Sequence, residues 1–193
     1  MIAALYVETG GCYFGLPDVD PWDETRDARR YFGPDRVIAH PPCAAWCQMA
    51  PVNQARYGRP IGADGGCFEA ALWSVRLFGG VLEHPAVSIA WRYFGLPRPP
   101  REGWSVADVY GGAAAQVEQG NYGHAARKKT WLYAVGVPLP ELKWGAGPKP
   151  TGWISADRPR AELAAMGFRQ IQKPEARRTP LAFRDILIEM VSQ

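Results

Sequence analysis

Long apolar runs, secretion signals and cysteine-rich spacing are all missing from this chain of 193 residues. No apolar run reaches the roughly 18 residues that a membrane-spanning helix needs. Residues 1–7 lack a basic segment and a small-residue cleavage site, so we expect a cytoplasmic protein with no membrane partner. The four cysteines form no repeated Cys-x-x-Cys pairs and are too few for a disulfide scaffold. We therefore expect reduced thiols that are free for packing, chemistry or metal binding.

Glycine and proline, in contrast, are abundant. The chain has 21 glycines and 18 prolines, about 20% of all residues against roughly 12% on average. Turns and irregular loops should therefore occupy a large share of the fold. With 47% hydrophobic and 21% charged residues, and no internal repeat, the sequence predicts one globular domain over residues 1–193.

Positive charge is concentrated at the C-terminal end of the chain. The net charge is only +3, but residues 120–193 hold 12 lysines and arginines against 6 acidic residues. Such a basic third suits an acidic partner, for example a nucleic-acid backbone. A solvated, solubilising surface is the ordinary alternative, and charge alone does not separate the two.

Strand and helix signals alternate along the chain. This alternation predicts a compact α/β fold with a mainly parallel sheet. Buried strands are expected over residues 2–7, 36–39, 81–82 and 130–137. Helices are expected over residues 23–32, 67–78, 159–166 and 180–191. Residues 50–66 and 95–103 resemble loops, and residues 106–119 resemble a hairpin that turns at 111–112.

The three histidines all lie next to predicted strands. His40 and His84 each follow a strand, and His124 precedes one. In parallel α/β sheets, ligands bind outside the carboxyl ends of the strands, and Cys43 and Glu83 share that location. A thiol, a carboxylate and a later cluster of arginine and lysine form a set suited to covalent catalysis. The ordinary alternative is a buried Cys43, a salt-bridged Glu83 and a solvated basic cluster.

A metal site is a second possibility at the same place. His40, Cys43 and Cys47 have spacing compatible with zinc ligands, and Cys67, His84 or His124 could complete the set. The order of motifs does not fit zinc deaminases, in which a His-x-Glu segment precedes Pro-Cys-x-x-Cys. We therefore favour a site without metal.

The order of these motifs resembles the DNA cytosine-5 methyltransferases, particularly the small methyltransferase-like proteins of bacteriophages. Residues 42–43 (Pro-Cys) look like the motif that carries the nucleophile in that family. Residues 83–85 (Glu-His-Pro) are similar to its Glu-Asn-Val/Pro motif, and residues 122–133 resemble its Gln-x-Arg-x-Arg strand motif. Residues 6–11 and 178–182 are looser echoes of its glycine loop and its final helix motif. The resemblance implies a partial Rossmann-like sheet without a target-recognition domain.

The resemblance also implies a mechanism, a transferase activity and a partner. The thiolate of Cys43 would add to C6 of a flipped-out pyrimidine, and Glu83 would bind the N3 and amino edge of the ring. Arg127 or Lys129 would contact O2 or a phosphate. The substrate is then a nucleic acid, with DNA favoured, or a nucleotide, in the host cytoplasm if a phage encodes the protein. The residues expected around this substrate are His40, Pro42, Trp46, His84, His124, Lys128 and Lys129.

The cofactor implied by the resemblance is S-adenosylmethionine. Its expected contacts are Glu8, Gly10, Gly11, Asp20 and Thr179. Only about 25 residues separate the glycine loop from the strand that begins at Arg36, and a βαβ unit takes about 30. We therefore expect the adenosine half of the cofactor pocket to be truncated.

A catalytically inactive descendant is the main alternative to an enzyme. Such a protein would bind nucleic acid or a protein partner through the same surface, for example against host defences. The eight tryptophans, eight tyrosines and the basic third would supply stacking and phosphate contacts. Trp46 and Trp91 each closely follow a motif and are the aromatic residues expected to line the site.

Overall fold

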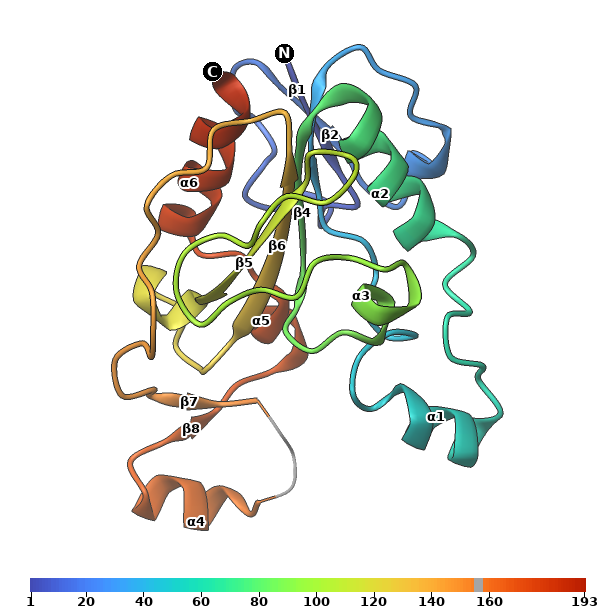
Figure 1. Cartoon of the computed structure of the whole chain (residues 1–193). Coiled ribbons are helices and arrows are strands. Elements are labelled where there is room, and N and C mark those ends of the chain that lie inside the picture. The colour runs from blue at the N-terminus through green and yellow to red at the C-terminus, as the bar shows by residue number, and fades with distance from the viewer. Residues whose placement is uncertain (155–157) are drawn as a thin grey trace.

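A six-stranded sheet forms the centre of the computed structural model, which describes residues 1–154 and 158–193 (Figure 1). The strand order is β2-β1-β3-β4-β6-β5. Strands β2, β1, β3 and β4 are mutually parallel, and β6 runs antiparallel to both of its neighbours. The predicted α/β fold is therefore confirmed, with a sheet that is mixed but mostly parallel. The strands are β1 (Ile2–Leu5), β2 (Val19–Trp22), β3 (Arg36–Ala39), β4 (Gly80–Pro85), β5 (Ala113–Glu118) and β6 (Lys129–Val135).

Two twelve-residue helices, α2 and α6, lie on opposite faces of this sheet (Figure 1). A short parallel pair, β7 (Gly152–Trp153) with β8 (Arg169–Gln170), lies outside the main sheet together with α4. The α-helices are α1 (Ala50–Tyr57), α2 (Cys67–Phe78), α3 (Ile89–Tyr93), α4 (Arg160–Ala165), α5 (Lys173–Arg177) and α6 (Leu181–Ser192). The 3-10 helices are η1 (Ala28–Arg30) and η2 (Gln119–Tyr122).

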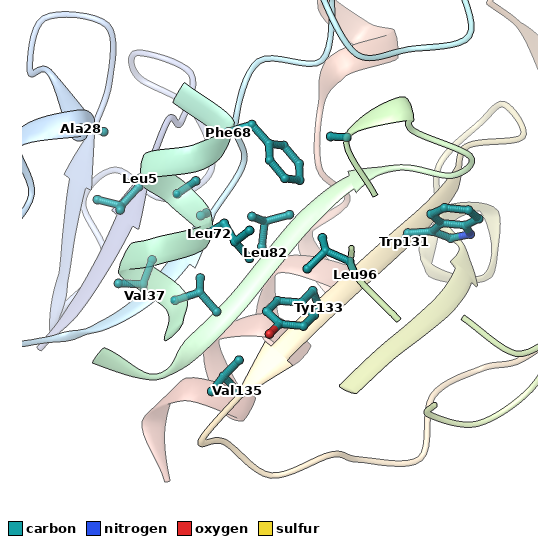
Figure 2. Close-up of a cluster of buried hydrophobic side chains, with 14 of the residues drawn as sticks. Leu5, Ala28, Val37, Phe68, Leu72, Leu82, Leu96, Trp131, Tyr133 and Val135 are labelled. Carbon is teal, nitrogen blue, oxygen red and sulfur yellow. The ribbon is translucent and has the colours of Figure 1, made fainter. Parts of the chain in front are cut away.

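The core consists of two layers, one on each face of the sheet. Ala3 and Leu5 of β1 pack with α2, as Figure 2 shows for Leu5 and Leu72, whereas Ile2 and Ala4 pack with α6. Successive strand residues point to opposite faces, so a strand covered on both sides must be apolar throughout. This explains why the short apolar runs at β1 and β3 could be recognised as strands from sequence.

The bounds of β3 and α2 agree with the sequence prediction, but two other expectations were wrong. Residues 23–32 form only the short η1, because Asp23 accepts hydrogen bonds from the amide and hydroxyl of Thr25 and closes a local turn instead. Residues 50–57 of the expected loop form α1. Ala50 is its one buried residue, so its sequence carries no apolar periodicity.

The predicted turn at Gly111 and Gly112 is present, but β5 pairs mainly with β6. The amide of Gly112 donates to Asp108 Oδ1, which closes the turn. On the other side of the turn, Trp104 makes a single bridge to Ala115 of β5, whereas all six residues of β5 pair with β6. The expected hairpin is therefore reduced to one bridge.

No helix within residues 1–154 and 158–193 combines the length and apolarity needed to cross a membrane.

The strand order reverses between β1 and β3. From β1 the chain goes to the edge strand β2, and it then returns to place β3 on the opposite side of β1. Such a reversal opens a crevice at the carboxyl ends of the strands, which is where open α/β sheets bind ligands. The end of β4, the residue after β3 and the segment after β1 lie at this edge and contribute Glu83, His40 and Tyr13 to the candidate site.

Candidate active site

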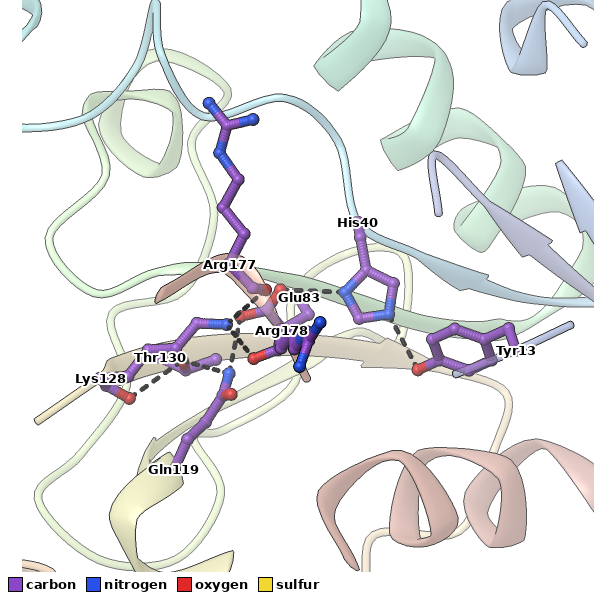
Figure 3. Close-up of polar contacts among 8 residues, drawn as sticks. All are labelled: Tyr13, His40, Glu83, Gln119, Lys128, Thr130, Arg177 and Arg178. Carbon is purple, nitrogen blue, oxygen red and sulfur yellow. Dashed lines mark hydrogen bonds and ion pairs between the residues drawn. The ribbon is translucent and has the colours of Figure 1, made fainter. Parts of the chain in front are cut away.

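Three side chains form a hydrogen-bonded line at this edge of the sheet (Figure 3). His40, directly after β3, has its Nδ1 atom 3.0 Å from Oε2 of Glu83 in β4. The Nε2 atom of His40 is 2.9 Å from the hydroxyl of Tyr13, which lies in the segment after β1. Both ring nitrogens of His40 are thus engaged within the protein. The sequence predicts that His40 contacts substrate, and in the structure its ring bridges Tyr13 and Glu83.

The second oxygen of Glu83 is also held. Gln119 Nε2 lies 3.1 Å from Glu83 Oε1 and 2.9 Å from Thr130 Oγ1, to both of which it donates. Glu83 is only 8% exposed, and burial alone would raise its pKa. The hydrogen bond from His40 and the charges of Lys128, His40 and His84 outweigh burial and hold the pKa of Glu83 at about 2. The carboxylate is therefore ionised at neutral pH and accepts hydrogen bonds.

Lys128 links this cluster to the C-terminal part of the chain. Its ammonium donates to the backbone carbonyls of Arg177 and Arg178, each at 3.1 Å. Figure 3 shows the Lys128 side chain among Glu83, Gln119 and these two carbonyls. The segment between α5 and α6, which includes Thr179, is consequently fixed beside the site.

Cys43 lies within electrostatic reach of Glu83. The thiol is half buried, and burial raises its pKa, with the neighbouring Cys47 and Glu83 adding to the effect. Arg177 acts in the opposite direction and lowers the pKa of Cys43. The residues on either side of Cys43, Pro42 and Ala44, line a cavity of about 380 Å³. Glu83 and Arg177 thus act on this thiol in opposite directions, and the resting state favours the protonated thiol.

Three consecutive basic residues, which end at the first residue of β6, have different surroundings. Lys128 is the one beside Glu83, while Arg127 and Lys129 are exposed. Arg127 lines a different cavity together with His124. Sequence reasoning had selected Arg127 for the catalytic set, because nothing in three adjacent cations shows which one faces the sheet edge.

Trp46 and Trp91 are buried, with 4% and 3% exposure. The indole N–H of Trp46 donates to Asp64 Oδ2 at 2.8 Å, and its ring packs on Phe68. Both tryptophans belong to the buried cluster around Phe68 and do not line a cavity among the described residues. His84 is also buried, with 1% exposure.

Some of the residues expected to bind a cofactor are already engaged in contacts within the protein. Glu8 and Gly10 are exposed, and the amide of Gly11 donates to the Glu8 carbonyl at 2.8 Å, which closes a tight turn. Asp20 pairs with Ala3, inside β2 and away from its carboxyl end, and its carboxylate is bound by Arg26.

The acidic residue at the carboxyl end of β2 is Asp23, which the sequence analysis had not selected. It is buried and accepts hydrogen bonds from the hydroxyls of Thr9 and Thr25. Residues 6–18, between β1 and β2, contain no helix. Neither Asp20 nor Asp23 is thus free for a ribose, so these residues do not fit the adenosine half of S-adenosylmethionine.

Metal ligands do not converge in the part of the chain that the structure describes. Within residues 1–154 and 158–193, no group of three or more His, Cys, Asp or Glu side chains is arranged to hold a metal ion. His40, the first residue of the proposed zinc set, has both nitrogens engaged with Tyr13 and Glu83.

The site also contains four residues that no motif in the sequence singles out: Tyr13, Gln119, Thr130 and Arg177. Gln119 directly follows β5, and Thr130 lies near the start of the antiparallel β6, so both lie at the same edge as Glu83. Their positions relative to strand ends were a usable signal. Tyr13 and Arg177 carry no such signal, because only the tertiary fold brings them to the crevice.

Neither a scan against protein-family models nor a search of the curated proteins finds a match to this chain. The function must therefore be inferred from the site itself.

Proposed function

We propose that this protein modifies a pyrimidine base, in nucleic acid or in a nucleotide, through covalent addition of Cys43. The observation that carries the proposal is that Cys43 follows β3 three residues after His40, whose ring is bound to the ionised, buried Glu83 of the neighbouring parallel strand β4. The reversal of strand order between β1 and β3 supports a Rossmann-like reading of the sheet. The motif order of the cytosine-5 methyltransferases supports the same chemistry and makes a transferase the favoured class.

The chemistry begins with loss of the Cys43 proton to water. Arg177 favours the resulting thiolate, which attacks C6 of the pyrimidine and leaves C5 nucleophilic. The electron pair of the broken C5–C6 double bond spreads over C5 and N3, and in cytosine N3 takes up a proton from water. Glu83 accepts hydrogen bonds from the ring N–H and the exocyclic amino group and so stabilises the adduct. Lys128 and His40 keep Glu83 ionised for this role. The identity of the group added at C5 stays open, since the described residues do not fit the adenosine half of the implied cofactor.

Positive charge around the site supports an anionic substrate. Arg127, Lys129, Arg177 and Arg178 are exposed, and Lys128 lies among them at the edge of the crevice. A cationic surface of this kind binds phosphates, so we favour nucleic acid, and DNA in particular, as the substrate.

A non-catalytic binding protein is the second candidate. One observation favours it: burial raises the pKa of Cys43, so the resting protein carries a thiol and not the reactive thiolate. In that case the same cationic surface would hold nucleic acid without modifying it.

Nucleoside mass spectrometry distinguishes the two functions. DNA, RNA and the free nucleotide pool would be compared from cells that express the wild type, Cys43→Ser or Cys47→Ser. The enzyme should produce a new pyrimidine nucleoside that Cys43→Ser abolishes and that Cys47→Ser, the matched thiol control, retains. The mass gain identifies the transferred group. An unchanged set of nucleosides in all three pools would contradict the proposed modification.

A further inference from the structure

The outer side of α2 carries large apolar side chains that the fold leaves exposed. The inner side of this helix packs on the sheet through Phe68, Leu72 and Val75. Trp73 and Leu77 lie four residues apart on the side away from the sheet, and both are exposed. A helix on the surface of a soluble protein normally presents polar residues on that side. The neighbours of these two side chains therefore decide whether they belong to a larger surface.

On one side of α2, the loop before β5 extends this apolar surface. The ring of Tyr110 lies 5.9 Å from that of Trp73, edge to face, and the neighbouring Val109 is exposed. Arg76 holds both rings, since its guanidinium carbon lies 3.8 Å from the centroid of Tyr110 and 5.5 Å from that of Trp73. The charge of Arg76 is in turn paired with Asp108 at 3.6 Å. The two aromatic side chains are thus held in place on a surface whose cation is already neutralised.

On the other side, the C-terminal end of α2 meets the segment that follows η1. Phe78 comes directly after Leu77 in the helix, and its ring lies 6.1 Å from that of Phe32, which is exposed. Both flanking segments lie beside α2 in the fold (Figure 1). These contacts join the exposed side chains into one surface, which we call the α2 face. Its exposed members are Phe32, Trp73, Leu77, Val109 and Tyr110.

The size of the α2 face fits an interface between two proteins. The exposed fractions of its five members range from 43% at Trp73 to 95% at Val109, so together they expose roughly 600 Å² of mostly apolar surface. Monomeric proteins rarely leave a larger apolar patch than this, and patches of this size are often functional. Each partner in a standard interface buries about 800 Å². The α2 face therefore supplies the apolar centre of such an interface, and its polar rim supplies the remainder.

Charge and symmetry favour a second copy of the chain as the partner. A face with unpaired charge would repel its own copy, but Arg76 at the α2 face is paired with Asp108. Glu69 lies one turn before Trp73, in the first turn of α2. If two α2 helices pack antiparallel, the two Glu69 carboxylates lie at opposite ends of the interface. Trp73 of each copy then lies against Leu77 of the other, so aromatic and aliphatic side chains meet.

We propose that the α2 face binds a second copy of this chain across a two-fold axis, with the two α2 helices antiparallel. A two-fold axis suits a single surface, because every contact between the copies then occurs twice. Trp73 and Tyr110 are of the residue types that contribute most to binding at interfaces, and Arg76 orients them beforehand. The α2 face contains neither Cys43 nor Glu83, so the inference does not depend on the proposed chemistry.

Sedimentation velocity of the full chain, from low to high micromolar concentrations, measures self-association. The wild type should pass from monomer to dimer as the concentration rises. Leu77→Glu buries an unpaired charge in the interface and should weaken dimerisation at least about 100-fold. Leu181→Glu is the matched control, because Leu181 at the start of α6 is 60% exposed and Leu77 is 65% exposed. A monomeric wild type at every concentration, or equal weakening in both variants, would overturn the proposal.

A charge exchange tests the antiparallel arrangement. Trp73→Lys and Leu77→Glu should each be monomeric alone, since each sets its new charge against an apolar side chain of its own copy. Mixed in equal amounts, the two variants should form a heterodimer, because the new lysine then lies against the new glutamate. Circular dichroism would confirm that both variants are folded. A mixture of folded variants that stays monomeric would overturn the arrangement.

Discussion

Protonation of His84 should destabilise the fold as the pH falls from 6.5 to 4. The side chain is 1% exposed, and its ring lies 5.1 Å from that of Phe68 and 6.5 Å from that of Trp91. Burial lowers the pKa of His84 from its ordinary 6.5 to about 4, against the opposing influence of Glu83 and the Pro42 backbone. Because the folded pKa is the lower one, the unfolded chain takes up the proton first.

The magnitude follows from the two pKa values. Full stability is present above pH 6.5 and is lost as the pH falls towards 4. The loss due to His84 is about 2 kcal/mol at pH 5 and about 3 kcal/mol at pH 4. This is a large part of the 5–15 kcal/mol that stabilises a typical domain.

Urea unfolding, followed by tryptophan fluorescence at pH 7, 6, 5 and 4, measures this loss. His84→Leu cannot take up the proton, so its free energy of unfolding should fall about 2 kcal/mol less than that of the wild type between pH 7 and 5. Glu83 changes the free energy of unfolding mainly below pH 4.5. There the unfolded chain protonates Glu83 before the folded protein does, so stability falls further in both proteins. Parallel pH dependence in the wild type and His84→Leu between pH 7 and 5 would refute the reasoning.

Two further predictions concern the sheet and its edge. Gly80→Ala should lower the melting temperature sharply. Gly80 has φ +144°, and an added Cβ would lie 2.0 Å from the Val37 carbonyl oxygen. An unchanged melting curve would contradict that close approach. Lys128→Met should raise the pKa of Glu83 by about one unit, since it removes the cation beside that carboxylate. Carboxyl NMR titration would show this rise, and Lys129→Met, at an exposed neighbouring position, should leave the pKa unchanged.

The elements that could be predicted well from sequence are those in which the pattern of apolar residues matches the side that is buried. β3 is a short apolar run buried on the sheet, and α2 has apolar residues at helical spacing between Gly66 and Gly79. Its start is further fixed by Asp64, which accepts from the amides of Gly66 and Phe68. Local sequence and tertiary packing agree in these elements, so the pattern was sufficient.

The location of the site could be predicted from the sequence, but not all of its residues could. Strand ends pointed to His40 and Glu83, because parallel strands bring their carboxyl ends to one edge. Tyr13 joins them only through the path of the segment after β1. The choice of Lys128 over Arg127 depends on which residue of the turn before β6 faces Glu83, and three adjacent cations leave that open.

Exchange of the pyrimidine C5 hydrogen with solvent tests covalent addition by Cys43 most directly, because it needs no donor group. Addition at C6 makes C5 basic, so C5 takes up deuterium from D2O and loses its original proton before the thiolate leaves. Cytosine- and uracil-containing oligonucleotides and mononucleotides would be incubated with the purified protein and followed by NMR. We expect exchange with the wild type and Cys47→Ser, slowing of at least about 100-fold in Glu83→Gln, and none in Cys43→Ser. Exchange that persists in Cys43→Ser, or its absence from the wild type with every substrate, would contradict the account.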